Sequence, residues 1–149
     1  MGRHAAVGDA PHVEGAAMRG VRVVRPAERD RGTAQTPGMV REAGVSQSTC
    51  GSAGVWMGEV RNDPGFRSGA HHHGAIESAI YVVSGRMRMR WGARLEEQAD
   101  AEAGDFIFVP AELVHQEINL SATEPLVAVV ARGGQENIVV NVELPEAAQ

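Results

Sequence analysis

The stretch GFRSGAHHHGAIESAIYVVSG, residues 65–85, decides the fold of this chain. It contains two short segments, residues 70–73 and 77–83, which are separated by a Gly-Ala bend and bounded by other glycines. Short runs of this kind between turn residues are typical of β-strands. Side chains two residues apart share one face of a strand, so His71 and His73 are expected to point the same way.

Further strands are expected on both sides of this stretch. Residues 86–91 (RMRMRW) alternate, which predicts one face of arginine and an inner face of Met87, Met89 and Trp91. In residues 104–110 (GDFIFVP), the two phenylalanines are expected on one side and Ile107 and Val109 on the other, with both sides buried between packed sheets. Five more strands are predicted, at residues 20–26, 55–60, 115–120, 126–131 and 137–142.

The intervening segment, residues 27–44, is polar and rich in Gly and Pro, so it is expected to be an ordered loop with one helical turn at residues 39–43. Roughly nine short strands without a convincing long helix predict an all-β sandwich or barrel. The length of 149 residues suits one domain. Residues 1–20 are rich in Ala and Gly and are expected to form a flexible tail, which leaves residues 21–149 as the single folded domain.

The composition excludes several classes of function. The net charge is −5 and the arginines are scattered, so nucleic acid is not an expected partner. No apolar run approaches the roughly 18 residues that a membrane span needs. The chain has one cysteine, which cannot form an internal disulfide, so a cytoplasmic location is the default expectation. It has no lysine, which excludes Schiff-base chemistry through a lysine side chain.

Four side chains that commonly bind divalent metals lie close to the turns of the predicted barrel: His71, His73, Glu77 and His115. Three imidazoles and one carboxylate make a good site for a first-row transition metal, and the absence of cysteine ligands argues against a closed structural zinc site. A histidine triplet alone could equally be a surface or core feature. Here four of the six histidines fall in two turn-rich segments, which favours a metal site. His72 is expected to face outward or to support a ligand.

Two sequence motifs carry a family resemblance. GFRSGAHHHGAIE, residues 65–77, resembles the first motif of the cupin family: Gly, five residues, His-x-His, three residues and Glu. The next family glycine corresponds to Gly85, one residue later than the commonest spacing. GDFIFVPAELVHQEIN, residues 104–119, resembles the second motif, with Gly, five residues, Pro, then His and an Asn four residues later. It departs from the family at Glu112, where Gly is usual.

The resemblance implies a double-stranded β-helix, or jelly-roll barrel, with a short N-terminal extension. It also implies one divalent transition metal (Fe, Mn, Ni, Zn, Co or Cu), with ligands His71, His73, Glu77 and His115. Small members of the family are commonly homodimers whose terminal strands cross to the partner. The candidate crossing segments here are residues 20–25 and 137–142.

The functional expectation is a metal-dependent enzyme that acts on a small organic molecule, with a dioxygenase as the leading candidate. An isomerase, lyase or decarboxylase that uses the metal as a Lewis acid is the alternative, and a non-catalytic ligand-binding cupin is a third. Two residues are candidates for a catalytic role. Glu117 shares a strand face with His115 and could act as a general base, or it could simply line the barrel wall. Tyr81 could hydrogen-bond a metal-bound ligand, or it could simply fill the barrel. A cavity wall of low polarity would suit a mostly apolar ligand. If instead the arginine face of residues 86–91 pointed inward, three arginines would enter the cavity and an anionic substrate would be expected.

Overall fold

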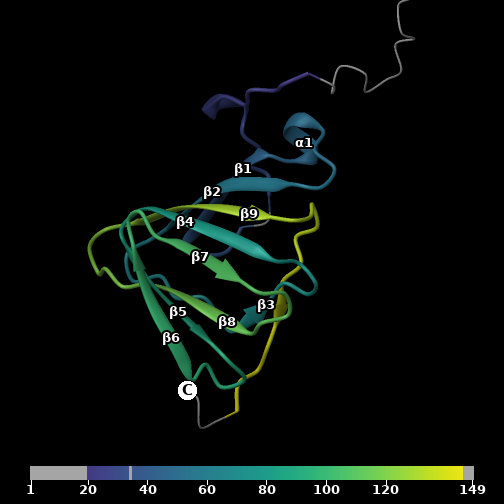
Figure 1. The fold of residues 1–149 in the computed structure, drawn as a ribbon. Coiled ribbons are helices and arrows are strands. Elements are labelled where there is room, and N and C mark those ends of the chain that lie inside the picture. The colour runs from purple at the N-terminus through teal and green to yellow at the C-terminus, as the bar shows by residue number, and fades with distance from the viewer. Residues whose placement is uncertain (1–19, 34, 146–149) are drawn as a thin grey trace, which may run out of the picture.

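The computed structural model describes residues 20–33 and 35–145 of the chain. Its strands form two five-stranded antiparallel sheets that lie face to face (Figure 1). The first sheet has the order β1 (Met39–Val45), β2 (Trp56–Asn62), β9 (Leu126–Arg132), β4 (Ser78–Ser84) and β7 (Phe106–Val109). The second has the order β10 (Val140–Asn141), β3 (His71–His72), β8 (His115–Asn119), β5 (Arg86–Trp91) and β6 (Glu97–Glu102). The architecture confirms the expected all-β jelly-roll barrel.

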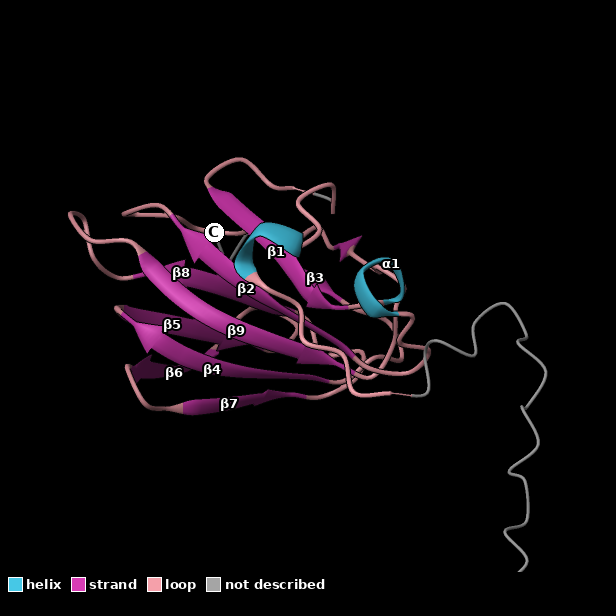
Figure 2. Ribbon diagram, turned by 90° about the horizontal axis from the view of Figure 1, so that it is seen from above, coloured by secondary structure: helices cyan, strands magenta, loops and turns pink. Residues whose placement is uncertain are grey.

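The core lies between the two sheets because each inner strand alternates apolar and polar side chains. In β4, Ile80 and Val82 are buried while their neighbours are exposed. In β5, Met87 and Met89 are buried, as the alternation predicted. These residues form one cluster together with Val109, Leu126 and Ala128. A view of the strands from above shows β9, β4 and β7 running beside one another over this core (Figure 2).

Two turns have backbone conformations that the sequence motifs require. Gly85 joins β4 to β5 with a φ of +94°, and an added Cβ would lie 3.0 Å from the carbonyl oxygen of Pro125, so only glycine fits there. Glu112 lies in the loop before β8 with a φ of +61°, at the position where the family usually has glycine. The turn is therefore kept despite the substitution, at the cost of a strained non-glycine residue.

Some predicted elements differ in the structure. Residues 39–45 form β1 instead of a loop with a helical turn, because pairing with β2 completes the first sheet. Strand β6, a 3-10 turn (Pro26–Glu28) and a short helix α1 (Gln47–Cys50) also escaped prediction. Conversely, residues 20–25 form no strand in the described structure, and the predicted C-terminal strand shortens to β10. Phe106 and Phe108, expected to be buried, are 80% and 62% exposed on an edge strand.

Most of the expected tail, residues 1–19, lies outside the described residues. Within the described part of the chain, no helix has the length and apolar character needed to cross a membrane.

Candidate metal centre

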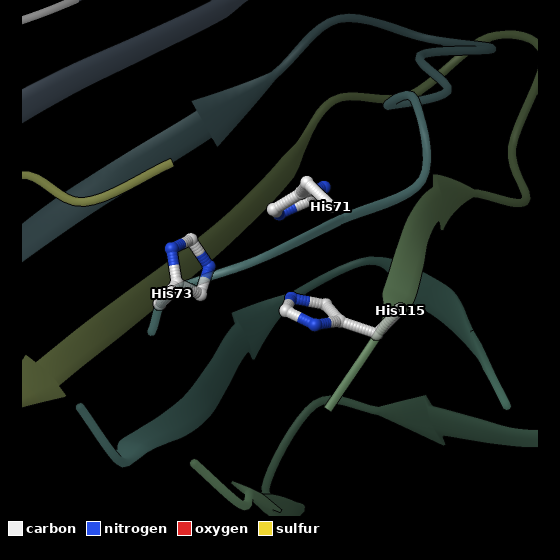
Figure 3. A group of neighbouring side chains, drawn as sticks. All are labelled: His71, His73 and His115. Atoms are coloured by element: carbon white, nitrogen blue, oxygen red, sulfur yellow. The ribbon is translucent and has the colours of Figure 1, made fainter. Parts of the chain in front are cut away.

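The second sheet brings three of the predicted ligands together. His71 in β3 pairs directly with His115 in β8, and His73 follows β3 on the same face as His71. The ring centroids of the three histidines are 4.4 to 5.1 Å apart. One ring nitrogen of each lies within 4.8 Å of the others (Figure 3). The antiparallel pairing of two short strands thus builds the cluster from segments more than forty residues apart in sequence.

Each of these imidazoles is held by a backbone carbonyl group. The Nδ1–H of His71 donates to Gly69 O (2.9 Å), that of His73 to Ile138 O (2.7 Å) and that of His115 to Leu113 O (2.9 Å). A carbonyl oxygen only accepts hydrogen bonds, so Nδ1 carries the proton in all three neutral rings. The lone pair of each Nε2 is therefore available to a metal, which is the arrangement usual for metal-binding histidines.

The surroundings of His73 and His115 also favour the neutral form of these two rings. Burial lowers the pKa of His73 to about 4, against a smaller opposing effect of the hydrogen bond to Ile138 O. Burial likewise lowers the pKa of His115. Since only a neutral imidazole binds a metal, these two ligands need shed no proton at neutral pH. The donor set thus fits a divalent transition metal, and His71, His73 and His115 are the residues that could hold it.

The structure does not bring Glu77 into this group. Its side chain is exposed and does not line the cavity beside the histidines. The cause is the phase of β4: Ser78, Ile80 and Val82 face inward, so Glu77 shares the outer face with Ala79 and Tyr81. The carboxylate expected as the fourth ligand is therefore turned away from the cavity.

Ser78, which was not among the predicted site residues, occupies the inward position instead. Its side chain is buried and lines the cavity, where it offers a neutral hydroxyl rather than a carboxylate. The sequence did hold a signal for this change. Gly85 comes one residue later than the first motif usually has it, which indicates one extra residue between His73 and the turn. That extra residue exchanges the inward-facing and outward-facing positions of the strand.

Of the two residues expected to be catalytic, one lines the cavity and the other does not. Glu117 lies in β8, lines the cavity, and places Oε1 3.8 Å from Nε2 of His115. Tyr81 lies on the outer face of β4, with 37% of its surface exposed and its ring packed on Phe106 at 4.8 Å. Tyr81 therefore does not reach the histidines. His72 is not part of the three-histidine group; its Nδ1 accepts a hydrogen bond from the backbone N–H of Gly74.

The histidines and Glu117 line a cavity of about 120 Å³ between the two sheets. Apolar side chains make up much of its wall, as expected, but two arginines line it as well. They are Arg41 of β1 and Arg132 of β9, not the arginines of residues 86–91, whose alternation keeps them on the outer side of β5. Arg41 was not among the predicted site residues, because its strand was predicted as a loop.

Comparison with known proteins agrees with this architecture. The polyketide cyclase RemF from Streptomyces resistomycificus superposes with a TM-score of 0.68 at 19% identity, over 85% of this chain and 88% of that one. KdgF from Halomonas sp. gives 0.63 at 19% identity, over 79% and 98%. An oxalate oxidase in complex with the substrate analogue glycolate gives 0.61 at 21% identity, over 76% of this chain but only 59% of the oxidase. These similarities show a shared fold.

A search of curated protein sequences gives no match. The family model described as the cupin domain, by contrast, matches residues 58–132, which is half of the chain and runs from within β2 to the end of β9 with all three histidines. The chain therefore belongs to the cupin domain family.

Proposed function

We propose that this chain is a metal-dependent enzyme that acts on a small organic molecule inside the barrel. The observation that carries the proposal is the set of three imidazoles that are each anchored through Nδ1 and each place one ring nitrogen within 4.8 Å of the others. Sites with three histidine ligands and an open position are typical of catalytic metals, whereas structural sites fill every position with protein ligands.

Lewis-acid chemistry is the reaction type that this donor set supports best. With Glu77 on the outer face, the group has no carboxylate, and an all-imidazole set suits Zn, Cu, Ni or Fe better than Mn. A bound divalent cation would supply polarisation of a substrate carbonyl or carboxylate oxygen. This favours an isomerase, lyase or decarboxylase among the expected classes.

Glu117 is the residue that we assign to proton transfer. Its side chain is only 17% exposed and lies beside His115 on the same cavity wall. Its carboxylate would accept a proton from the substrate or return one to it, while the cavity wall limits access of water. No other carboxylate lines the cavity among the described residues.

The metal-binding part is tested by titrating zinc into the metal-free protein by calorimetry. Single variants His71→Gln, His73→Gln and His115→Gln should each lose more than the roughly 10–100-fold in affinity that loss of an outer supporting residue costs. His72→Gln is the matched control, because it removes an imidazole from the same segment but not from the cluster. Equal zinc affinity in all four variants would refute the site.

The catalytic part is tested by proton exchange. Zinc-loaded protein is incubated in D₂O with small carbonyl compounds, and loss of the C–H signal next to the carbonyl is followed by NMR. Glu117→Gln should keep the zinc and slow the exchange by roughly 10²–10⁴-fold. Binding of these compounds without exchange would instead support a non-catalytic binding protein.

A dioxygenase is the second candidate, because three imidazoles also bind Fe and Cu and leave positions open. Oxygen consumption by the iron-loaded protein with catechols, diketones or thiols would favour it over Lewis-acid chemistry. A homodimer and a cytoplasmic location stay predictions from the sequence. Sedimentation velocity of the full chain tests the first, and fractionation of the source cells tests the second.

A further inference from the structure

Two arginines line the cavity that contains the candidate metal centre. Arg41 in β1 and Arg132 at the end of β9 belong to the first sheet, whereas His71, His115 and Glu117 belong to the second. All five line the same cavity. A small molecule between the sheets would therefore meet the histidines on one wall and the arginines on the other.

Arg132 is buried without a carboxylate to balance its charge. Only 8% of its surface is exposed, and its guanidinium lies over the ring of Trp56 at 4.1 Å. The one hydrogen bond of its side chain within the described structure runs from NH1 to the side-chain oxygen of Asn137 (3.2 Å), and its Nε has no partner. Burial, and then the charge of Arg41, lower its pKa to about 10, so Arg132 stays protonated at neutral pH.

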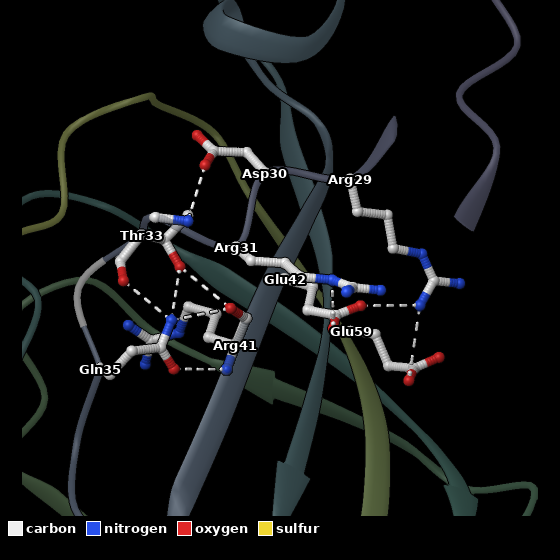
Figure 4. A network of polar contacts seen from close by, with 9 residues as sticks. Arg29, Asp30, Arg31, Thr33, Gln35, Arg41, Glu42 and Glu59 are labelled. Atoms are coloured by element: carbon white, nitrogen blue, oxygen red, sulfur yellow. Dashed lines mark hydrogen bonds and ion pairs between the residues drawn. The ribbon is translucent and has the colours of Figure 1, made fainter. Parts of the chain in front are cut away.

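Arg41 is held in place through its backbone. The side-chain oxygen of Gln35 accepts from the Arg41 N–H at 2.8 Å, and the Gln35 amide donates to the Arg41 carbonyl at 2.9 Å. The hydroxyl of Thr33 donates to the same carbonyl, as Figure 4 shows. Gln35 thus pairs with this edge strand as a neighbouring strand would, and it fixes the position from which the Arg41 side chain starts. This explains the role of the polar segment before β1.

One buried charge in the cavity wall has no opposite charge beside it. The wall contains Arg41, Arg132 and Glu117, and Arg132 forms no ion pair with a carboxylate among the described residues. A divalent cation on the three histidines would add two positive charges. A buried charge is costly unless a counter-charge or hydrogen bonds offset it. An anionic ligand would supply that counter-charge.

We infer that the molecule bound in this cavity is a small carboxylate, held at its charged end by Arg41 and Arg132 and presented at its other end to the histidine cluster. The inference rests on the proposed function, because it names the class of molecule that the same site takes. Guanidinium groups suit this task because their planar N–H groups match the two oxygens of a carboxylate. The cavity of about 120 Å³ limits the ligand to a small acid, well below the roughly 300–1,000 Å³ of pockets for drug-sized molecules.

The test compares acids with their amides on metal-free protein, so that carboxylate binding to a metal cannot contribute. Malonate, succinate and benzoate are titrated by calorimetry against malonamide, succinamide and benzamide. At least one acid should bind roughly tenfold or more tighter than its amide, since hydrogen bonds to charged groups are worth about that factor or more. Equal affinity within every pair, including no detectable binding, overturns the inference.

Arginine variants then locate the contact. Arg41→Gln and Arg132→Gln should each weaken binding of the preferred acid by about tenfold or more. Arg61→Gln is the matched control: it removes the same charge from the exposed face of the adjacent strand β2 and should leave the affinity unchanged. Circular dichroism and thermal melts establish that each variant folds. Should Arg132→Gln not fold, Arg41→Gln and Arg132→Lys decide the question, and unchanged affinity in the folded arginine variants overturns the inference.

Failure of the proposed function is distinguishable in the same experiment. A His71→Gln/His115→Gln variant lacks two metal ligands but keeps both arginines, so it should retain the preference for acid over amide. If wild-type protein binds no metal yet prefers acids, the metal centre is refuted and the carboxylate site stands. If it binds metal with no preference for acids, the opposite holds.

Discussion

At the scale of single residues, the candidate site depends on which side chains the strands turn inward. The sequence predicted His71, His73 and His115 correctly as neighbours, because alternation along a strand and the spacing of turns are local properties. It placed Glu77 and Tyr81 at the site, whereas both face outward. One extra residue after His73 shifts β4 by one position, and a shift of one position moves every side chain of a strand to the opposite face.

The shifted histidine pKa values predict a pH dependence of stability in the metal-free protein. His73 has a pKa of about 4 when folded and about 6.5 when unfolded. As pH falls below 6.5, the unfolded state takes up the proton first, so the free energy of unfolding should fall between pH 6.5 and about pH 4; the lowered pKa of His115 acts in the same direction. Urea unfolding at pH 7.5, 6.5 and 5.5 measures it. A flatter profile is expected for His73→Gln, and a wild-type stability that rises toward pH 5.5 would contradict the assignment.

Glu112 offers a test of backbone strain away from the histidines. Its φ of +61° lies in the left-handed region, which costs a non-glycine residue roughly 1–2 kcal/mol. A glycine at this position would relieve that strain, but part of the gain in stability is offset by the greater conformational freedom of glycine in the unfolded chain. Glu112→Gly should therefore raise the free energy of unfolding by up to about 1 kcal/mol, as measured by urea titration. Glu112→Ala, which keeps a Cβ, is the control, and equal stability of the two variants would argue against strain at this position.

At the scale of elements, the phase of β4 should determine which metal the site prefers. Ser78 is the first residue of β4, and its buried side chain lines the same cavity as the three histidines. Ser78→Glu should add a hard oxygen donor and shift the preference of the site from zinc toward manganese and iron. Competitive loading followed by elemental analysis measures the shift. Ala79→Glu, one residue along and facing outward, should leave the preference unchanged; the same shift in both variants would mean that Ser78 does not face the metal.

The elements that escaped prediction owe their conformation to tertiary pairing. Residues 39–45 contain glycine and two charged residues, and only their alignment with β2 makes them a strand. Strand β6 is polar and exposed along most of its length, and it pairs with β5 at the edge of the second sheet. Propensity carries little information about such edge strands, because their hydrogen bonds are made to distant segments. Arg41 was missed for this reason, and with it the charge of the cavity.

At the scale of the whole molecule, the metal centre should couple to folding stability. The three candidate ligands come from β3, the segment after it and β8, and the carbonyl that holds His73 belongs to the C-terminal segment at Ile138. A metal that binds only the folded chain stabilises it by about 2.7 kcal/mol at a concentration of 100 times Kd. For a domain of this size, that corresponds to a rise in Tm of roughly 5–10 °C. Chelation should reverse the rise, His72→Gln should keep it, and His115→Gln should abolish it.

The overall architecture was predictable, because turn residues and alternating side chains recur along the chain and both motifs contain such patterns. The charge of the cavity was not predictable, because Arg41 and Arg132 come together only when β1 and β9 enter the same sheet. A pair of residues more than ninety positions apart leaves no local pattern in a single sequence.

X-ray absorption spectroscopy of the zinc-loaded protein tests the central claim most directly. We predict one zinc per chain, with three imidazole nitrogens at about 2.0–2.1 Å and no sulfur. His72→Gln should leave this spectrum unchanged, and His115→Gln should lower the zinc content. A spectrum without imidazole scattering, or full zinc occupancy in a variant that lacks His71, His73 and His115, would contradict the account.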